Sequence, residues 1–468
     1  MIETQPLTAS HVFRATHNTL PSTSHAFVFS QRGLLVILLA HVLLGWVLFR
    51  FGATAATIHA FLILLLGLFF LFRDAQPARM IYIVAYVVGA EALWRATSAR
   101  IFWETGKYAL ILLFGLALLK YARRRKPAIW GLFYFFLLLP SVLMLPTFDR
   151  QALAFNLAGP FALALAVMLF SLLKLDMPHF KSVLLAILAP TVTLGFYVLL
   201  KIRTAPTIFF GASSNFAASG DYGPNQVAII LALGTLAAIY YALLEENLFI
   251  RYLLLAVSLW LLAQSVLTFS RSGFWTTLIA LVLSSFYLLR SFRRLSAFLF
   301  SALLLAALGY YFVFPYLENF TGSALSSRFS NVNSTGRVEI MRADWLIFSE
   351  YPLLGVGPGQ SYGYHASTFR AASAHTEYTR LLSEHGIFGL FALLLLLLAC
   401  ARRAFTPMDT VSKAFLVGIL AWALLFMVTS ATRQVAPSFL LGLVMARINL
   451  ETPPSMESIA PVPSHNGG

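Results

Sequence analysis

Four arginines lie in or close to strongly apolar sequence: Arg203, Arg271, Arg337 and Arg342. Arg271 is the sharpest case, because the stretch LTFSRSGFW is apolar except for this residue and its small neighbours. An arginine at the edge of a lipid-spanning segment marks a charged ligand, a buried partner or a side chain that extends to lipid headgroups. Its planar guanidinium group suits phosphate oxygens. Several arginines on one face therefore predict a site for a polyanion, such as a lipid diphosphate.

A second group of ionisable residues occurs in AHTEYTRLLSEHGIFGL (374–390), just before an apolar segment. Ser373 is a candidate N-cap for a helix that has His375 in its first turn. A helix N-terminus disfavours the imidazolium form, so a neutral imidazole there can accept a proton from a hydroxyl and act as a general base. Glu377, Arg380 and Glu384 share a neighbouring helix face, and Glu377 is a candidate substrate contact.

Each of these residues also has a structural interpretation. The arginines can extend to lipid headgroups, and Arg342 can pair with Glu339 or Glu350. The carboxylates and the arginine of residues 377–384 can form a solvated set of ion pairs on a helix surface. His375 can be a hydrogen-bonded structural histidine. The residue types alone leave these alternatives open.

Other chemistries lack their usual motifs. His365, His375, Glu377 and His385 lie near one another in sequence, but no HExxH or comparable metal-ligand spacing appears. The segment GVGPGQ lacks the GK[ST] ending of a phosphate-binding P-loop, and no nucleophile elbow or Asp-x-Asp pair occurs in this segment. We therefore expect no metal and no cofactor.

The elements that must position these residues are membrane helices. The chain has 468 residues, of which 59% are hydrophobic and only 11% charged, and its long apolar runs exclude a β-barrel of short alternating strands. The net charge of +15 comes from short basic clusters between apolar runs, which fits membrane topology and not nucleic-acid binding. A single cysteine, Cys400, excludes a disulfide framework. The predicted fold is all-α, a polytopic helical integral membrane protein.

We expect about fourteen spans, with twelve or thirteen as alternatives. Their predicted centres lie near residues 42, 63, 86, 114, 138, 163, 191, 233, 259, 282, 304, 393, 420 and 442. The basic clusters Lys120–Lys126, Arg290–Arg294 and Ala401–Phe405 then fall on one face, which the positive-inside rule places in the cytoplasm. The unusual polar motifs fall on the opposite face, which is the periplasm in a Gram-negative cell.

The expected organisation has five parts: a disordered cytoplasmic tail (1–30), spans 1–11 (31–314), a large, partly helical periplasmic loop (315–385), the last spans (386–450) and a second disordered tail (451–468). Within the loop, Val338, Met341, Trp345 and Phe348 recur at helical spacing and predict an amphipathic helix. Tyr351-Pro352 ends that helix, and a glycine-rich turn follows.

Together, TFSRSGFW, TGRVEIMRADWLIFSEYPLLGVGPGQ and HTEYTRLLSEHGIFGL resemble the bacterial O-antigen ligase/polymerase family, in this order and on one face. GPNQVA (223–228) and EALWRATSARIFWETGKY (91–108) also look like segments of that family. The resemblance covers roughly residues 80 to 400. It departs from the family pattern at Thr376, where an asparagine commonly follows the histidine.

The resemblance implies a function. Such proteins take a glycan from undecaprenyl diphosphate at the periplasmic face of the inner membrane, without nucleotide sugar, ATP or a required metal. Ligases pass the glycan to the lipid A core, and polymerases pass it to another lipid-linked saccharide. Arg271 and Arg337, with Arg203 less closely matched, resemble diphosphate-binding arginines, and His375 resembles the family's general base. Arginines would stabilise the leaving diphosphate while a base activates the acceptor hydroxyl.

The expected function is thus an inverting, metal-independent glycosyltransferase of the ligase type. A polymerase of the same family is the nearest alternative. A transporter or flippase of lipid-linked saccharides is a different class, which would favour charges buried in mid-span and duplicated halves. Glu91 is the one plausible mid-span acid, and no duplicated halves are detectable.

Overall fold

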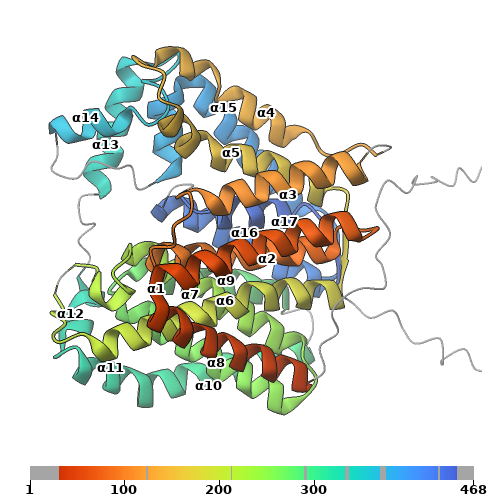
Figure 1. Ribbon diagram of the computed structural model, residues 1–468, viewed down its shortest axis with the longest axis vertical. Coiled ribbons are helices and arrows are strands. Elements are labelled where there is room, and N and C mark those ends of the chain that lie inside the picture. Colours follow the sequence, from red (N-terminus) through yellow and green to blue (C-terminus); the bar gives the residue numbers. More distant parts are fainter. Residues whose placement is uncertain are drawn as a thin grey trace, which may run out of the picture.

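The computed structural model describes residues 31–122, 125–211, 213–288, 292–331, 337–368, 376–430 and 433–450, and these are almost entirely helical (Figure 1). Within these ranges, two three-residue strands, β1 (Lys174–Asp176) and β2 (Arg447–Asn449), pair in parallel. The expected all-α, polytopic fold is confirmed. The predicted tails, 1–30 and 451–468, lie outside the described residues.

The helices of the first half are α1 (Gln31–Arg73), α2 (Ala78–Ala96), α3 (Thr105–Tyr121), α4 (Trp130–Leu137), α5 (Arg150–Phe170), α6 (Met177–Thr204) and α7 (Pro224–Leu244). Those of the second half are α8 (Leu248–Leu267), α9 (Arg271–Leu288), α10 (Phe292–Leu308), α11 (Phe314–Phe320), α12 (Ala324–Ser330), α13 (Arg337–Glu350), α14 (Ser361–Thr368), α15 (Glu377–Phe405), α16 (Thr410–Ser430) and α17 (Ala436–Leu443). Short 3-10 helices occupy Pro140–Met144 and Ala217–Ser219, and a π-helix joins α10 to α11 at Gly309–Val313.

Among the described residues, 8 helices are long and apolar enough to cross a membrane. They are Gln31–Arg73, Arg150–Phe170, Met177–Thr204, Ala217–Leu244, Leu248–Leu267, Phe298–Phe320, Glu377–Phe405 and Thr410–Thr429. Every predicted span centre lies in a helical segment, including the shorter apolar segment Trp130–Met144. The protein is a multi-pass membrane protein, and its number of spans stays a prediction.

The long helix α1 is a folded-back pair of helices. Gly52 has φ 57° and ψ −137°, a conformation open to glycine and unlike a helix. His41 and His59 both hydrogen-bond the hydroxyl of Tyr86, at 3.1 and 3.0 Å. In a straight helix these histidines would be about 27 Å apart, so α1 must reverse direction between them. The two halves of α1 therefore account for two of the predicted spans.

Two opposite faces can be defined from hydrogen bonds. The inner face is tied together by three bonds: Ala128 N to Ser171 Oγ (2.8 Å), Arg447 N to Leu173 O (3.0 Å) and Arg403 Nη2 to Ala446 O (2.6 Å). These bonds bring the chain next to the Lys120–Lys126 cluster onto the same face as the Ala401–Phe405 cluster, as the topology predicts.

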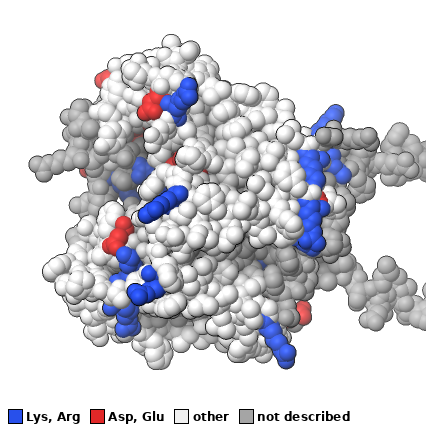
Figure 2. Space-filling model, in the orientation of Figure 1, with Lys and Arg blue, Asp and Glu red and all other residues white. Residues whose placement is uncertain are grey.

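The outer face carries the polar motifs. It is linked by Asn215 N to Thr268 O (2.8 Å), Arg328 Nε to Phe269 O (3.0 Å) and Arg203 Nη2 to Tyr316 Oη (3.4 Å). Figure 2 shows lysines and arginines gathered at two opposite ends of the molecule, with a wide band between them that is almost free of charge. Such a band is expected where lipid tails surround a protein.

The segment of the predicted loop (315–385), called the outer segment, includes α12, α13 and α14, which lie at one edge of the molecule (Figure 1). The predicted glycine-rich turn is present, with positive φ at Gly355, Gly357 and Gly359. It packs on the first part of α15, which kinks at Gly386 (φ 59°). A Cβ at Gly386 would lie 2.5 Å from the Leu353 carbonyl oxygen, so the close approach requires glycine.

The predicted amphipathic helix is α13, and it ends at Glu350, directly before Tyr351-Pro352. Its apolar stripe nevertheless does not face the protein, because Val338, Met341 and Trp345 are exposed. The buried face carries Ile340, Ala343, Asp344 and Ile347. Burying Asp344 satisfies hydrogen bonds from His365, Thr379 and Ser383, at 2.9, 2.6 and 2.8 Å. This polar network decides which side of α13 turns inward.

Candidate functional site

Three arginines meet on the outer face. Arg271 begins α9, Arg328 lies in α12 and Arg337 begins α13. Burial, followed by the charges of Arg271 and Arg337, holds the pKa of Arg328 below its usual range. Burial and then the charge of Arg271 do the same to the pKa of Arg337. These like charges act on one another, so an anion placed among them would be stabilised by all three.

The backbone of residues 268–271 brings two of these arginines together. Phe269 has φ 58°, which is rare for a bulky residue. Its carbonyl oxygen accepts a hydrogen bond from Arg328 Nε at 3.0 Å, while its buried ring packs 4.9 Å from the ring of Phe210. Arg271 Nη1 donates to the carbonyl oxygen of Asn331, at the end of α12. Backbone carbonyl groups thus hold both guanidinium groups in place.

The small residues around Arg271 have defined roles. Ser270 Oγ lies 2.7 Å from Asn225 Oδ1 and 2.8 Å from Ser272 Oγ. A Cβ at Gly273 would lie 2.4 Å from Ser265 Oγ and 2.6 Å from the Ala228 carbonyl oxygen, so glycine lets α9 approach α7. The GPNQ motif and the SRSG turn therefore form one unit that fixes the start of α9.

The other predicted arginines lie differently. Arg203 is exposed at the end of α6 and donates to the hydroxyl of Tyr316 in α11. Arg342 is exposed on α13, and within the described part of the chain no ion pair joins it to Glu339 or Glu350. His375 falls in 369–375, outside the described residues, so its role stays a prediction.

Glu377 lies in a buried ion-pair network, so the interpretation of residues 377–384 as a solvated helix surface is wrong. Arg380 Nη2 and Nε lie 2.6 and 2.9 Å from the two carboxylate oxygens of Glu377, and Nη1 lies 2.7 Å from Glu384. All three side chains are buried. A buried carboxylate held at both oxygens by one arginine is a structural anchor. The structure pairs Glu377 with Arg380. The contact of Glu377 with substrate stays a prediction.

Helix α15 begins at Glu377, so its N-cap lies three residues after the position predicted for it. Thr376, not Ser373, is the N-cap, and its hydroxyl accepts a hydrogen bond from Tyr378 N at 3.2 Å. Thr376 can cap the helix because its hydroxyl accepts a hydrogen bond from a backbone N–H of the first turn that has no partner within the helix. Asparagine caps helices equally well, so threonine performs here a task that asparagine can perform in the family pattern.

His365 and His385, two of the histidines considered as metal ligands, have different hydrogen-bond partners. His365 Nε2 lies 2.9 Å from Asp344, and His385 Nδ1 lies 2.6 Å from the hydroxyl of Ser141. Among the described residues, no group of three or more His, Cys, Asp or Glu side chains is placed to hold a metal ion.

An apolar cavity of about 680 Å³ lies within the lipid-spanning region, between α7, α8, α9 and α10. Its lining extends to Leu317 in α11 and Leu325 in α12, three residues from Arg328. Phe274 also lines it, and its ring is 5.9 Å from that of Phe329, the residue after Arg328. The cavity therefore reaches the neighbourhood of the arginine cluster.

Arg328 is the residue that sequence reasoning missed. It lies in SSRFS, a polar stretch of the outer segment, so no apolar context distinguishes it from an ordinary surface arginine. Asn225, which contacts the SRSG turn, was noted within a motif but not as part of the site.

The fold defines a multi-pass helical membrane protein with its clustered arginines at one face. Residues 253–394 match the family model described as O-Antigen ligase, which confirms the resemblance drawn from the motifs. The matched segment holds Arg271, Arg328 and Arg337 together with the outer segment. A search of curated proteins found no match. The family match supports a ligase- or polymerase-type function on glycans at a membrane.

Proposed function

We propose that this protein transfers a glycan from undecaprenyl diphosphate to an acceptor hydroxyl of the lipid A core, at the periplasmic face of the bacterial inner membrane. The observation that carries the proposal is the cluster of Arg271, Arg328 and Arg337 beside the end of an apolar cavity. A lipid diphosphate has both matching parts: an anionic head for the arginines and a hydrocarbon tail for the cavity.

The cavity suits a lipid tail. Its lining is mostly aliphatic and aromatic, and the hydroxyl groups of Thr235, Ser258, Thr277 and Ser285 donate to helix carbonyls, as at Thr277 Oγ1 to Ala232 O (3.2 Å) and Ser258 Oγ to Leu255 O (2.7 Å). Because these hydroxyl groups are already hydrogen-bonded, a hydrocarbon chain can lie against them without the cost of an unpaired polar group.

The arginines would act on the leaving group. The acceptor oxygen forms a bond to the anomeric carbon on the face opposite the diphosphate, and the bond between that carbon and the diphosphate oxygen breaks, which inverts the configuration. The bond's electron pair leaves with undecaprenyl diphosphate, whose added charge the guanidinium groups stabilise. Since arginines supply this positive charge, the reaction requires no metal ion.

His375 would take the proton of the acceptor hydroxyl as general base. It directly precedes Thr376, whose capping bond starts α15, and Glu377, which Arg380 anchors. The two residues that follow this histidine are therefore held in the protein, which supports a catalytic position for it.

Arg271→Lys tests the role of the arginine cluster. Purified protein in lipid nanodiscs would receive undecaprenyl-diphosphate-linked glycan, with lipid A core and a second lipid-linked saccharide offered separately. We expect the variant to reduce transfer by about tenfold to hundredfold, because lysine replaces a two-pronged contact by a point charge. Arg342→Lys is the matched control, since Arg342 is exposed and outside the cluster. Near-normal transfer by folded Arg271→Lys protein would contradict the proposal.

The acceptor experiment also separates the two members of the family. Product on lipid A core identifies a ligase, while longer lipid-linked chains identify a polymerase. Neither product, from folded protein that binds the donor, would favour transport.

His375→Ala tests the general base. We expect transfer to be lost while the variant still binds undecaprenyl-diphosphate-linked glycan, because the donor's diphosphate is held by the arginines. Loss of folded protein would instead identify a structural histidine.

A further inference from the structure

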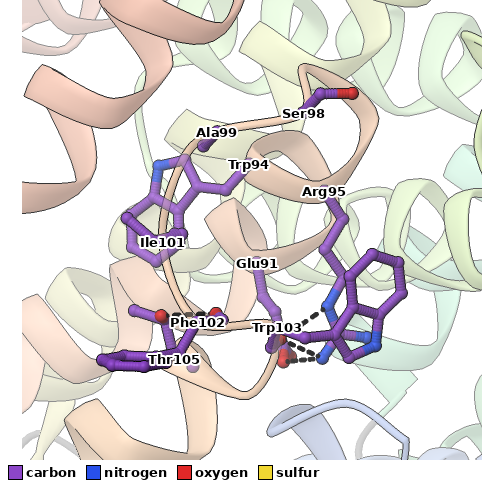
Figure 3. A pocket seen from close by; sticks show the side chains of 10 residues that line it. Glu91, Trp94, Arg95, Ser98, Ala99, Ile101, Phe102, Trp103 and Thr105 are labelled. Carbon is purple, nitrogen blue, oxygen red and sulfur yellow. Dashed lines mark hydrogen bonds and ion pairs between the residues drawn. The ribbon is translucent and has the colours of Figure 1, made fainter.

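A second cavity, of about 260 Å³, opens at the connection between α2 and α3 (Figure 3). Residues that line it include Glu91, Trp94, Arg95, Ser98, Phe102 and Trp103. Ligand pockets for drug-sized molecules measure roughly 300–1,000 Å³, so this cavity suits a single small ring. The EALWRATSARIFWETGKY motif forms it, and the arginine cluster does not account for that motif.

The charged groups at the base of the cavity are already matched. Arg95 Nη2 lies 2.7 Å from Glu91 Oε1, and Glu91 Oε2 accepts a hydrogen bond from Val435 N at 2.7 Å. Arg95 also donates to Gln226 Oε1 at 3.2 Å and to the Trp103 carbonyl oxygen at 2.9 Å. An ionic ligand would have to displace these partners, so the cavity favours an uncharged ligand.

The rim is aromatic and open. The side chains of Phe102 and Trp103 are 79% and 53% exposed, and Trp94 forms a buried wall whose indole N–H donates to His59 Nδ1 at 3.0 Å. The Trp103 ring is held in place by the Arg95 guanidinium, 4.8 Å from the ring centre. Exposed, fixed aromatic rings offer flat apolar faces against which the C–H face of a sugar ring can stack.

Ser98 supplies a polar group at the opening. It has φ 53°, a conformation that is uncommon outside glycine and is found at ligand sites. In Figure 3 its hydroxyl points away from the helix, and among the described residues no hydrogen bond engages it. Ser98 thus gives this cavity, which aromatic side chains also line, a hydroxyl that can bond a neutral, hydroxyl-bearing ligand.

This cavity is coupled to the arginine cluster through the first turn of α7. Gln226 contacts Arg95, and its neighbour Asn225 contacts Ser270, which precedes Arg271. The first turn of α7 therefore connects this cavity to the residue before Arg271, where we propose that the diphosphate of the lipid-linked glycan binds.

We propose that the cavity binds one sugar ring of the lipid-linked glycan and so selects the saccharide that is transferred. This inference rests on the proposed function, because it takes the glycan as the substrate. Phe102 stacks on this sugar ring, and Ser98, at another edge of the opening, hydrogen-bonds a hydroxyl of the glycan.

The test uses the full chain in nanodiscs and the oligosaccharide released by mild acid from the lipid-linked pool of the cells that make this protein. Binding of this free oligosaccharide is measured by titration calorimetry, with inorganic diphosphate present to occupy the arginines. We expect Phe102→Ala to weaken binding about threefold to tenfold. Phe209→Ala is the matched control, an outer-face phenylalanine that is 87% exposed and outside the cavity.

Trp103→Phe is the second variant, because it keeps a ring beside Arg95 and leaves the backbone carbonyl contact intact; we expect it to retain most of the binding. Equal binding by the Phe102→Ala and Phe209→Ala variants, or no saturable binding by the unchanged protein, overturns the proposal. Saccharide binding that depends on Phe102, together with normal transfer by Arg271→Lys, would instead reject the proposed diphosphate site and keep the sugar site.

Discussion

Arginines occur in two contrasting settings in this protein. Arg95 and Arg380 are buried against carboxylates, Arg95 with Glu91 and Arg380 with both Glu377 and Glu384. Arg271 and Arg328 donate to backbone carbonyls and lie beside each other's charge. In the first setting carboxylates pair with the guanidinium group, while in the second the guanidinium groups contact backbone carbonyls and stand close to like charges. The partner, not the residue type, thus distinguishes an anchor from a binding group.

The two settings also predict different effects when an arginine is replaced. A buried ion pair is destabilising when one member is lost, because the other charge stays in the interior. Removing one of several mutually repelling arginines relieves repulsion in the free protein. Anchoring arginines should therefore affect folding, while cluster arginines should affect only donor binding and transfer.

The largest effect is expected from Arg380→Gln. The substitution removes the arginine that bridges the buried carboxylates of Glu377 and Glu384, and breaking such a buried pair costs about 3–5 kcal/mol. We expect a sharp loss of monodisperse protein after mild heating, measured by fluorescence-detected size exclusion. Adding Glu377→Gln should recover part of that loss, because one buried charge is removed. Arg342→Gln, at an exposed position, should behave like the unchanged protein. Full stability of Arg380→Gln would remove the distinction between the two settings.

A smaller effect, on a different property, is expected from Arg328→Gln. Hydrogen bonds to charged groups contribute about 1.5–3 kcal/mol, so transfer should fall about tenfold to hundredfold while thermal stability stays near normal. Initial rates at varied donor concentration, and inhibition by inorganic diphosphate, would measure the change. Inhibition by diphosphate should weaken in parallel with donor binding. Unchanged inhibition would show that Arg328 lies outside the diphosphate site, and Arg342→Gln controls for the general loss of one positive charge.

The helical membrane fold could be predicted because apolar runs of membrane-spanning length specify helices without help from distant contacts. The glycine-rich turn and the end of α13 just before Tyr351-Pro352 depend on local sequence and could therefore be predicted too. The partners of the arginines were not local. Arg328 meets Phe269 across 59 residues, and no sequence spacing predicts that bond.

Burial was equally hidden in the sequence. The spacing of Glu377 and Arg380 showed that they could pair, but a solvated pair and a buried pair have the same spacing. Their environment depends on other segments, as shown by Asp344 of α13, which hydrogen-bonds Ser383 of α15. The apolar stripe of α13 did not predict the buried face of the helix for the same reason, since the hydrogen bonds of Asp344 place a different face inward.

The smallest effect is expected at Thr376, and it sharpens the comparison at the one place where the sequence departs from the family pattern. Thr376→Ala removes the hydroxyl that accepts the N–H of Tyr378, which costs about 0.5–2 kcal/mol and loosens the first turn of α15 without touching the ion pairs that follow. Thr376→Asn restores a capping oxygen. We therefore expect Thr376→Ala to lower the apparent melting temperature and transfer modestly, and Thr376→Asn to match the unchanged protein in both measurements. If Thr376→Asn fails in transfer while its melting temperature is normal, the side chain at this position contacts substrate, and the residue after His375 belongs to the binding setting instead of the anchoring one.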